Sequence, residues 1–598
     1  MIRNVVEPHH DGSSLYVSND APELGDIVNF RVRVPKGDKS KNIYIRIIED
    51  GEARIFPLKR KSSNQFETWW SVNVDILNPT TNYRFLLKNG KEFRWLNAFG
   101  VIAGDVTDHH DFRIICKTKT PQWIKSAIFY QIFPDRFANS GKIKKLPDWA
   151  VPRAWNSLPQ GRGKYTGQEF FGGDFEGVES KIDYLKELGV NAIYFTPFFP
   201  SRSNHRYDAT SFDHADPLLG GDEALISLSR TAARNEIKIM GDLTTNHCGA
   251  GHPWLKERRE YFYWDSKIPH GYVGWWGLAS LPKLNFGSSA LHREMYSGAN
   301  SIVKKWLREP FSMAGWRIDV GNMTGRLGAD DFNRDVAKGI RKAMEEISPE
   351  TWLVAENADQ AAEDLDGFGW HGTMNYNGFT KPIWHWINAP KGKKKIEDSL
   401  GMPGELGKIT GLAMVNGLRS FAAGIPWRSL TASMILLDSH DRARFHTVVG
   451  GDIHRHLVGA TLLFTYPGVP SVFAGDEIGI EGSWGEDARR TINWDDRSKW
   501  NIRLLEQYKK LINIRRNSSA LIEGGLRWIY LDETAVGYLR ESAKESILVL
   551  VTSGKSKVNL DLSKYGYQIR DTLHGPSLKG KKITFSTKGP TSGIWLLK

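Results

Sequence analysis

Acidic side chains end three separate apolar segments of this sequence. Asp319 and Glu356 are the last residues of two such segments, and Asp441 follows a third. One acid in such a place is often only a helix N-cap, but three of them from three segments suit the cleavage of a glycosidic bond. In that reaction one carboxylate attacks the anomeric carbon, while a protonated carboxyl group gives its proton to the departing oxygen. The sequence therefore predicts a carboxylate-based glycosidase site.

Neighbouring residues indicate how the acids divide this chemistry. Arg317 lies two residues before Asp319, so both side chains point to the same face of a strand, and the guanidinium would keep Asp319 ionised, as a nucleophile requires. Glu356 follows Leu-Val-Ala, an apolar approach that would raise its pKa, as a general acid requires. His247 and His440 are expected to donate hydrogen bonds to sugar hydroxyl groups. No zinc-type spacing such as H-E-x-x-H occurs, so metal catalysis is the weaker hypothesis.

These residues fall in a part of the chain where predicted strands alternate with predicted helices. Apolar residues recur at helical spacing in 176–188 and 332–347. Short apolar runs predict strands at 127–133, 192–196, 237–243, 315–320, 352–356, 433–438 and 471–475. Such regular alternation predicts an α/β fold with a parallel sheet, which about eight strands would close into a (β/α)8 TIM barrel. Catalytic residues of such barrels lie at the carboxyl ends of the strands.

Strand-like patterns also flank the barrel segment on both sides. Residues 28–34 alternate between apolar and polar side chains, which predicts an N-terminal β-sandwich over 1–118. Similar runs return in 516–598 and predict a C-terminal β-sandwich, which leaves 119–515 for the barrel. The stretch 247–310, after the third predicted strand, is too long for a simple connection. We expect it to form an inserted subdomain over the barrel mouth.

Composition excludes several other classes of protein. Hydrophobic residues make up 40% and charged residues 25% of the 598 residues, which is the balance of a folded globular protein. The net charge of +12 is spread along the chain, so no nucleic-acid partner is expected. Two cysteines cannot build a disulfide framework. The N-terminus lacks a signal-peptide pattern, and prolines interrupt the longest uncharged stretch, 457–475, so we expect a cytoplasmic protein with no membrane segment.

Short motifs at the predicted strand ends resemble those of the α-amylase family, glycoside hydrolase family 13. They are Asp242-Leu-Thr-Thr-Asn246-His247, Gly315-Trp-Arg317-Ile-Asp319, Glu356 and Ser439-His440-Asp441. A fifth motif, Leu281-Pro-Lys-Leu-Asn285, is similar to the signature of the neopullulanase, cyclomaltodextrinase and maltogenic amylase subfamily. The layout of that subfamily, two β-sandwiches around a barrel with an inserted domain, resembles the order of domains predicted here.

The resemblance implies a role for each matching residue. Asp319 would be the nucleophile, Glu356 the general acid and base, and Asp441 the carboxylate that binds and distorts the sugar. The α configuration would be retained, with the two catalytic carboxyl groups about 5–5.5 Å apart. The residues expected to contact the substrate are Tyr207, which would stack under the sugar, and His205, Asp242, Asn246, His247, Arg317, His440 and Arg489.

The sequence departs from the subfamily pattern beside two of the acids. Glu356 is followed by Asn357-Ala-Asp359 where the subfamily commonly has an aliphatic residue and then Trp, and Val-Gly-Asn follows Asp319 instead of Ala-Asn-Glu. The segment before Arg489 lacks the usual Asp-Pro. These changes flank the acceptor side of the cleavage point and leave the preferred substrate open. The pattern is closer to an actinobacterial branch that includes cyclic maltosyl-maltose hydrolase.

Two further sites are predicted around the barrel. Of the adjacent Trp275 and Trp276, at most one needs to be in the core, and Trp276 is taken as a sugar platform at the barrel mouth. Asn139, Gly172 and Asp174 resemble part of a calcium site of some relatives. Calcium takes six to eight oxygen ligands, so a tight structural turn is the favoured alternative. No cofactor is expected to be required.

The leading hypothesis is a retaining hydrolase of small linear, branched or cyclic maltooligosaccharides that cuts α-1,4 bonds, with α-1,6 bonds left open. A transglycosylase would use the same acids and is the nearest alternative. A non-catalytic glucan-binding protein is disfavoured because all three acids are present. The resemblance further implies a homodimer in which the N-terminal domain packs over the active site of the partner.

Overall fold

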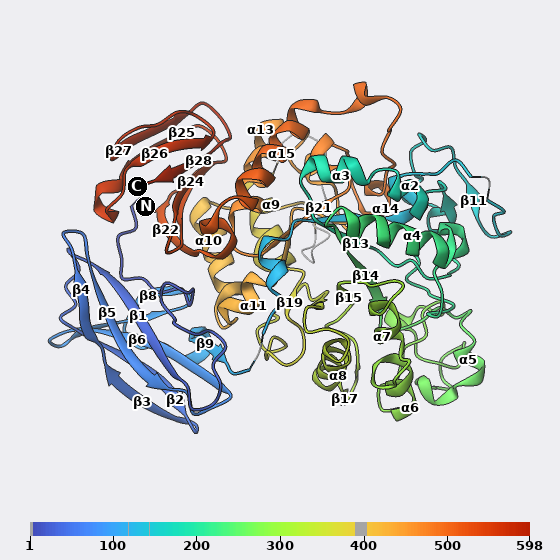
Figure 1. The fold of residues 1–598 in the computed structure, drawn as a ribbon, viewed down its shortest axis with the longest axis horizontal. Coiled ribbons are helices and arrows are strands. Elements are labelled where there is room, and N and C mark those ends of the chain that lie inside the picture. Colours follow the sequence, from blue (N-terminus) through green and yellow to red (C-terminus); the bar gives the residue numbers. More distant parts are fainter. Residues whose placement is uncertain (1–3, 118, 143, 389–403) are drawn as a thin grey trace.

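An eight-stranded parallel sheet forms the centre of the molecule (Figure 1). The computed structural model describes residues 4–117, 119–142, 144–388 and 404–598. A parallel bridge between Met374 and Met434 joins the two edges of the sheet and closes it into a barrel. In chain order the strands are β10 (Phe129–Ile132), β13 (Ala192–Phe195), β14 (Lys238–Thr244), β15 (Gly315–Asp319), β18 (Trp352–Ala355), β19 (Gly372–Thr373), β20 (Met434–Leu436) and β21 (Val469–Phe473). The predicted (β/α)8 fold is confirmed.

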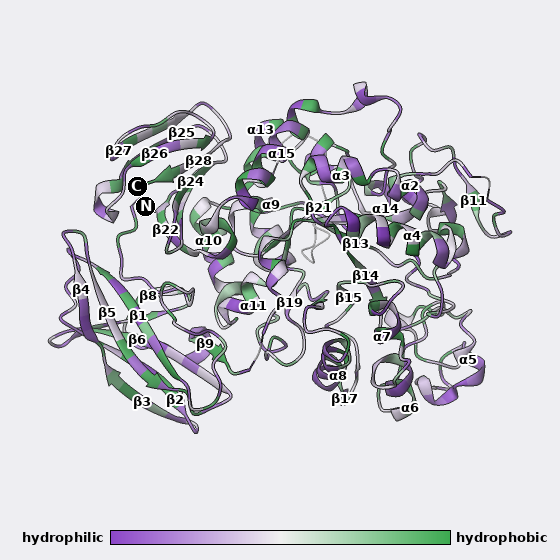
Figure 2. Ribbon diagram, viewed as in Figure 1, coloured by the Kyte–Doolittle hydropathy of each residue, from purple (hydrophilic) through white to green (hydrophobic). Residues whose placement is uncertain are grey.

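Amphipathic helices cover the outside of the barrel. Helix α8 (Asn333–Glu345) buries Val336, Ile340 and Met344, which are spaced four residues apart, and its remaining surface is hydrophilic (Figure 2). The helix predicted over 176–188 is instead two helices, α2 (Phe175–Glu179) and α3 (Ile182–Leu188). Other helices of this layer are α4 (Gly221–Arg234), α7 (Ile302–Leu307), α13 (Ile453–Thr465) and α15 (Ile502–Arg516). Within the described residues, no helix combines the length and apolar character needed to cross a membrane.

Antiparallel sheets lie before and after the barrel in the chain. In the N-terminal sheets, blue in Figure 1, β5 (Glu67–Asp75) pairs with β1 (Ile27–Pro35) and with β4 (Lys59–Ser63). In the second sheet β2 (Asn42–Glu49) pairs with β3 (Glu52–Pro57) and with β6 (Thr80–Asn89). The C-terminal sheets, red in Figure 1, contain β22 (Gly525–Leu531), β23 (Ala535–Glu541), β24 (Ser546–Thr552), β28 (Thr591–Leu597) and β26 (Ile569–His574), with β25 (Ser556–Asp561) and β27 (Lys582–Thr587) as a separate pair. Each end of the chain has its own hydrophobic core.

The segment after β14 contains only short elements, such as α5 (Trp254–Glu257) and α6 (Ser289–His292). Isolated bridges hold it together instead of a regular sheet. One of them pairs His247 with Lys283, and another pairs Phe262 with Leu284. The first bridge ties the segment to the carboxyl end of β14, which is where the predicted site lies.

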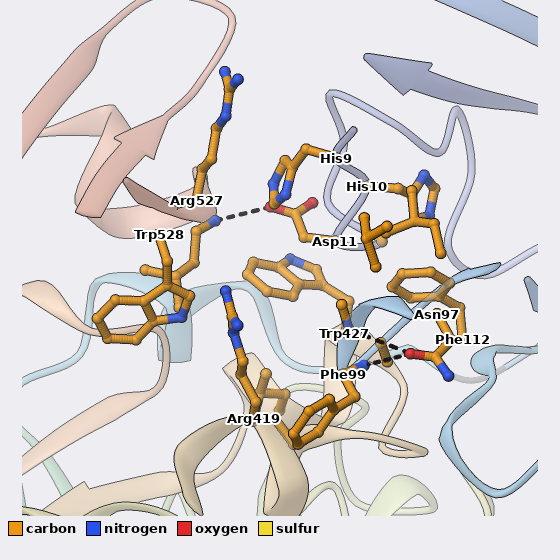
Figure 3. Close-up of a pocket in the computed structure, with 18 of the residues that line it drawn as sticks. His9, His10, Asp11, Asn97, Phe99, Phe112, Arg419, Trp427, Arg527 and Trp528 are labelled. Carbon is orange, nitrogen blue, oxygen red and sulfur yellow. Dashed lines mark hydrogen bonds and ion pairs between the residues drawn. The ribbon is translucent and has the colours of Figure 1, made fainter. Parts of the chain in front are cut away.

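Buried charges join the N-terminal and C-terminal sheets. Arg33 of β1 donates hydrogen bonds to both carboxylate oxygens of Glu541 of β23, at 2.9 and 2.5 Å. A cavity of about 120 Å³ at the same junction is lined by the N-terminal segment, α10 (Gly411–Ala422) and β22 (Figure 3). At its edge the Asp11 carboxylate accepts a hydrogen bond from the backbone N–H of Leu526 at 2.8 Å. The three parts of the chain therefore meet in one polar, buried junction.

We expect Glu541→Gln to lower the free energy of unfolding by about 3 kcal/mol at pH 7, because it removes the carboxylate 2.5 Å from the buried Arg33 and leaves only Glu67, at 3.6 Å, as a counter-charge. Burial raises the pKa of Glu541, but Arg33 and Arg527 outweigh it and lower the pKa to about 2. The charge of Glu541 therefore stabilises the fold fully when the pH is above 4.5, the ordinary pKa of a glutamate. This contribution is lost as the pH falls from 4.5 through about 2. Urea unfolding should show that the difference in free energy of unfolding between the wild type and Glu541→Gln becomes smaller as the pH falls from 4.5 to about 2. A difference that stays constant with pH would contradict the prediction.

Candidate active site

The carboxyl ends of three adjacent strands bring the predicted acids together around one arginine. Arg317 of β15 lies beside Asp242 of β14 and beside Val354 of β18 in the strand register. Its Nη1 donates to both oxygens of Asp242 at 2.9 Å and to Oδ1 of Asp319 at 2.8 Å. Its Nη2 lies 2.8 Å from Oε2 of Glu356. One fully buried guanidinium thus contacts three carboxyl groups.

The charge balance of this cluster favours a retained proton. Burial raises the pKa of Asp319 well above its usual range; Arg317 opposes this shift, and Glu356 adds to it. Burial also raises the pKa of Asp242 to about 6, against the effect of Arg317. The prediction that Arg317 keeps Asp319 ionised is therefore not borne out for the free protein, because burial outweighs the single positive charge and favours a proton on the Asp319–Asp242 pair. A cluster of this kind can supply both the acid and the anion that retaining hydrolysis needs.

A strained residue positions Glu356. Val320, directly after Asp319, has a φ of 37°, which is rare for a β-branched residue. Its backbone N–H donates to Oε2 of Glu356 at 2.9 Å. The Glu356 side chain remains 16% exposed, whereas Asp319 is 9% exposed at its side chain. Of the two predicted catalytic acids, Glu356 is therefore the one more open to solvent.

Asp441 is held by a second arginine. Nη2 of Arg489 lies 3.2 Å from Oδ1 of Asp441, and Nε of Arg489 donates to the backbone oxygen of His440 at 2.8 Å. Burial raises the pKa of Asp441, but His440 and Arg489 outweigh it and lower the pKa to about 2. Asp441 is therefore an anion at neutral pH, in contrast to the proton-sharing cluster around Arg317.

A hydrogen-bonded chain fixes the predicted tyrosine platform. Nε2 of Gln131 donates to Nδ1 of His440 at 2.8 Å, so the His440 proton is on Nε2, which lies 2.6 Å from the Tyr207 hydroxyl. That hydroxyl donates to Asp242 at 3.0 Å. The Tyr207 ring is stacked on His440 at 5.6 Å and on His205 at 5.9 Å between ring centres. Burial lowers the pKa of His440 to about 3, so the imidazole is neutral and the chain persists at neutral pH.

Three stacked rings lead from the acids to the solvent. Nδ2 of Asn246 donates to Nδ1 of His247, which leaves the proton on Nε2, 3.9 Å from Oδ2 of Asp319. This buried Nε2 has no hydrogen-bond partner among the described residues, so it is an available donor for a bound hydroxyl group. Trp275 stacks on His247 at 5.3 Å, and Trp276 stacks on Trp275 at 5.2 Å. Trp276 is 79% exposed, with a φ of 50°.

Lys283 is a site residue that sequence analysis missed. It belongs to the fifth motif and is 3% exposed. Its ammonium group contacts the side-chain oxygen of Asn246 and donates to the backbone oxygen of Met323 at 2.7 Å. Burial lowers the pKa of Lys283 to about 8, so it is charged at neutral pH. Burial, with this charge beside it, lowers the pKa of His247 to about 3. Nothing in the motif spacing signals these contacts.

The departures from the subfamily pattern form a polar network beside Glu356. Asn357 donates to Asp364 at 3.0 Å, and Nη2 of Arg326 donates to the same carboxylate at 3.0 Å. Asp359 accepts a hydrogen bond from Asn377 at 3.1 Å. The acceptor side predicted from the sequence is therefore lined by hydrogen-bonded polar side chains.

Asn139, Gly172 and Asp174, which resemble part of a calcium site, lie together in a tight turn, and the side chain of Lys144 occupies its centre. The Lys144 ammonium donates to the Gly172 backbone oxygen at 2.8 Å and lies 2.7 Å from Oδ2 of Asp174. Asn139 accepts a hydrogen bond from Gly141 of its own turn. Among the described residues, no group of three or more His, Cys, Asp or Glu side chains could hold a metal ion. The residues present do not fit a calcium ion while Lys144 occupies this place.

The family profile and the most similar relatives point to the same protein family. The family profile described as the α-amylase catalytic domain matches residues 131–496. A cyclomaltodextrinase from Bacillus sp. is 27% identical, covering 89% of this chain and 93% of the relative, and a maltogenic α-amylase from Bacillus acidopullulyticus is 28% identical, covering 85% and 84%.

Solved structures agree with this family. Cyclic α-maltosyl-(1→6)-maltose hydrolase from Arthrobacter globiformis has a TM-score of 0.65 at 27% identity, covering 80% of this chain and 100% of that one. A solved cyclomaltodextrinase has a TM-score of 0.72 at 24% identity, covers 98% of this chain and 99% of its own, and shows the same fold. Because the family profile spans more than half of the sequence and contains the barrel with its cluster of acids, this chain belongs to the α-amylase family of glycoside hydrolases.

Proposed function

We propose that this protein is a retaining hydrolase of α-1,4-glucosidic bonds in small maltooligosaccharides. The observation that carries the proposal is the contact of one guanidinium, Arg317, with both Asp319 and Glu356 at 2.8 Å. Two carboxyl groups held on the same guanidinium suit a double displacement, in which they must be close together. The names of the relatives, cyclomaltodextrinase and maltogenic amylase, support small α-glucans as the substrates.

The proposed reaction uses each acid in turn. Asp319 attacks the anomeric carbon while Glu356 protonates the departing oxygen, which gives a covalent glycosyl-enzyme. Glu356, now ionised, then removes a proton from water, and the water attacks the same carbon from the opposite side to Asp319. Two inversions restore the α configuration. Asp441 and the Nε2–H of His247 would bind hydroxyl groups of the sugar at the cleavage point.

The test of this function is the anomer that is released first. The protein would be incubated with maltotriose, pullulan, cyclodextrins and cyclic maltosyl-maltose, and proton NMR would follow the products. We expect the α anomer first, followed by mutarotation to the mixture. Initial release of the β anomer would contradict retention, and transfer products in excess acceptor would favour the transglycosylase. Cleavage of pullulan measures how far the activity tolerates α-1,6 bonds, and cleavage of cyclic maltosyl-maltose measures how far it extends to cyclic substrates.

We expect Trp276→Ala to raise KM by about two- to tenfold with little change in kcat, because loss of ring stacking costs about 0.5–1.5 kcal/mol. The fold should persist, since the side chain is 79% exposed. Steady-state kinetics on maltotriose measure both constants. Phe93→Ala, which removes another exposed ring from the N-terminal sheets, is the matched control and should change neither. An unchanged KM in Trp276→Ala would remove this residue from the substrate site.

We also infer a cytoplasmic homodimer. A groove over β4 and β5, lined by Trp69 and Trp70 together with basic side chains such as Lys59 and Arg60, supports a contact surface on the N-terminal sheets. An intracellular maltogenic amylase from Bacillus subtilis, 28% identical over 85% of this chain, supports the location. Light scattering after gel filtration should give about twice the chain mass of 67.6 kDa. The chain mass at all concentrations would contradict the dimer.

A further inference from the structure

A lysine side chain occupies the centre of the turn that resembles part of a calcium site. Nζ of Lys144 donates to the backbone oxygens of Gly172 and Gly173 at 2.8 and 3.4 Å, and it lies 2.7 Å from Oδ2 of Asp174. The Lys144 side chain is 16% exposed and that of Asp174 is 3% exposed. A positive charge is therefore surrounded by two carbonyl oxygens and one carboxylate, which are the ligand types that calcium prefers.

The oxygen-lined turn is built independently of the lysine. A Cβ at Gly173 would lie 2.2 Å from the backbone oxygen of Pro134, so only glycine allows this close approach. The carboxylate of Asp135 accepts hydrogen bonds from the backbone N–H groups of Phe171 and Gly172 at 3.1 and 3.0 Å. The carbonyl groups of the turn are thus aimed at Lys144 by contacts on their other side.

The remaining polar atoms of the turn already have partners within the protein. Oδ1 of Asp174 accepts from the N–H of Gly177 at 2.7 Å and caps α2, while its Oδ2 accepts from the Ser140 hydroxyl at 2.6 Å. Oδ1 of Asn139 accepts from the N–H of Gly141 at 2.6 Å. The one negative charge of Asp174 is matched by the one positive charge of Lys144. A calcium ion beside the ammonium group would face a like charge with too few free oxygens.

The turn is connected to the proposed sugar site through a chain of polar contacts. Nε of Arg136 donates to the Asp135 carboxylate at 2.7 Å, and its Nη1 donates to the backbone oxygen of Arg489 at 2.7 Å. Arg489 in turn holds Asp441. A change in the turn can therefore reach the site through Asp135 and Arg136, although no residue of the turn touches the acids.

We propose that the ammonium group of Lys144 is a built-in cation that takes the place of a structural calcium ion. The loop after β10 is tethered to the start of α2 by this side chain, and the fold needs no metal ion at this position. Replacing the lysine by alanine frees the carbonyl oxygens of Gly172 and Gly173 beside the Asp174 carboxylate, so a calcium ion whose remaining ligands are water molecules can bind in its place. This inference does not rest on the proposed hydrolase activity.

The experiment is thermal unfolding of the wild type and of Lys144→Ala, each in EDTA and in excess calcium chloride. We expect the Tm of the wild type to be the same in both conditions. The Tm of Lys144→Ala in EDTA should fall by about 3–6 °C, since a buried charge loses its partner. Calcium should restore a large part of that loss. Lys142→Ala is the matched control. Lys142 lies two residues before Lys144 in the chain and forms an exposed ion pair with Glu176, so this variant should behave as the wild type.

Three results would overturn the proposal. A wild type whose Tm falls in EDTA holds a metal ion after all. A Lys144→Ala variant with the same Tm as Lys142→Ala means that the ammonium group does not stabilise the turn. A fall in the Tm of Lys144→Ala that calcium does not reverse means that Lys144 forms an ordinary ion pair and does not take the place of a calcium ion. If Lys144→Ala fails to fold, the calcium content of the wild type after dialysis against calcium decides instead: a stoichiometric amount at this turn would overturn the proposal, and none supports it.

Discussion

Asp319→Asn should abolish turnover and leave the protein folded. An amide is too weak a nucleophile to form the glycosyl-enzyme, so kcat should fall by about four orders of magnitude or more, as when other enzymes lose their nucleophile. Asparagine has the same shape and keeps an oxygen that can accept from Arg317. Initial rates on maltotriose measure the loss, and circular dichroism with the Tm measures the fold.

The stability of this variant is a second readout. Burial raises the pKa of Asp319 well above its usual range, which means that its charge costs folding free energy at neutral pH. Asp319→Asn should therefore unfold at the same temperature as the wild type or at a higher one. Asp571→Asn, the same change at an exposed side chain of the C-terminal sheet, is the matched control and should leave kcat unchanged. Activity of Asp319→Asn close to that of the wild type would rule out its role as nucleophile.

Most of the barrel could be predicted because its strands are buried on both faces and appear as continuous apolar runs. Strand β19 was missed, since it has only two residues, Gly372 and Thr373, and no apolar run of its own. Its position depends on pairing with β18 and on the bridge from Met374 to Met434. These contacts join residues that are distant in the sequence, and no local pattern encodes them.

The acids of the site could be predicted for a different reason. Residues at the carboxyl ends of neighbouring parallel strands lie at the same edge of the sheet. The positions of Asp319 and Glu356 at two such strand ends were therefore enough to predict that they lie close together. Lys283 and Lys144 lie in irregular segments, where side-chain direction does not follow from spacing. Their roles depend on the carbonyl groups that they meet, and these come from other parts of the chain.

Glu356→Gln should separate proton donation from nucleophilic attack. With maltotriose, whose departing oxygen needs a proton, kcat should fall by about 10²- to 10⁴-fold. With 4-nitrophenyl α-maltoside or α-maltosyl fluoride, the first step needs no proton and should remain fast. The glycosyl-enzyme would then accumulate, because no base activates water, and a burst of leaving group should precede slow turnover.

The contacts of Glu356 make this comparison interpretable. Glutamine keeps an oxygen that can accept from the N–H of Val320, so the loop after Asp319 should stay in place. Azide, which attacks the anomeric carbon without a base, should restore turnover of the activated substrates and give the α-glycosyl azide, since Asp319 still supplies one of two inversions. Glu363→Gln, at a side chain that is 84% exposed, controls for the loss of a carboxylate. An equal loss of rate on every substrate, with no burst and no response to azide, would mean that Glu356 supports the site without transferring the proton.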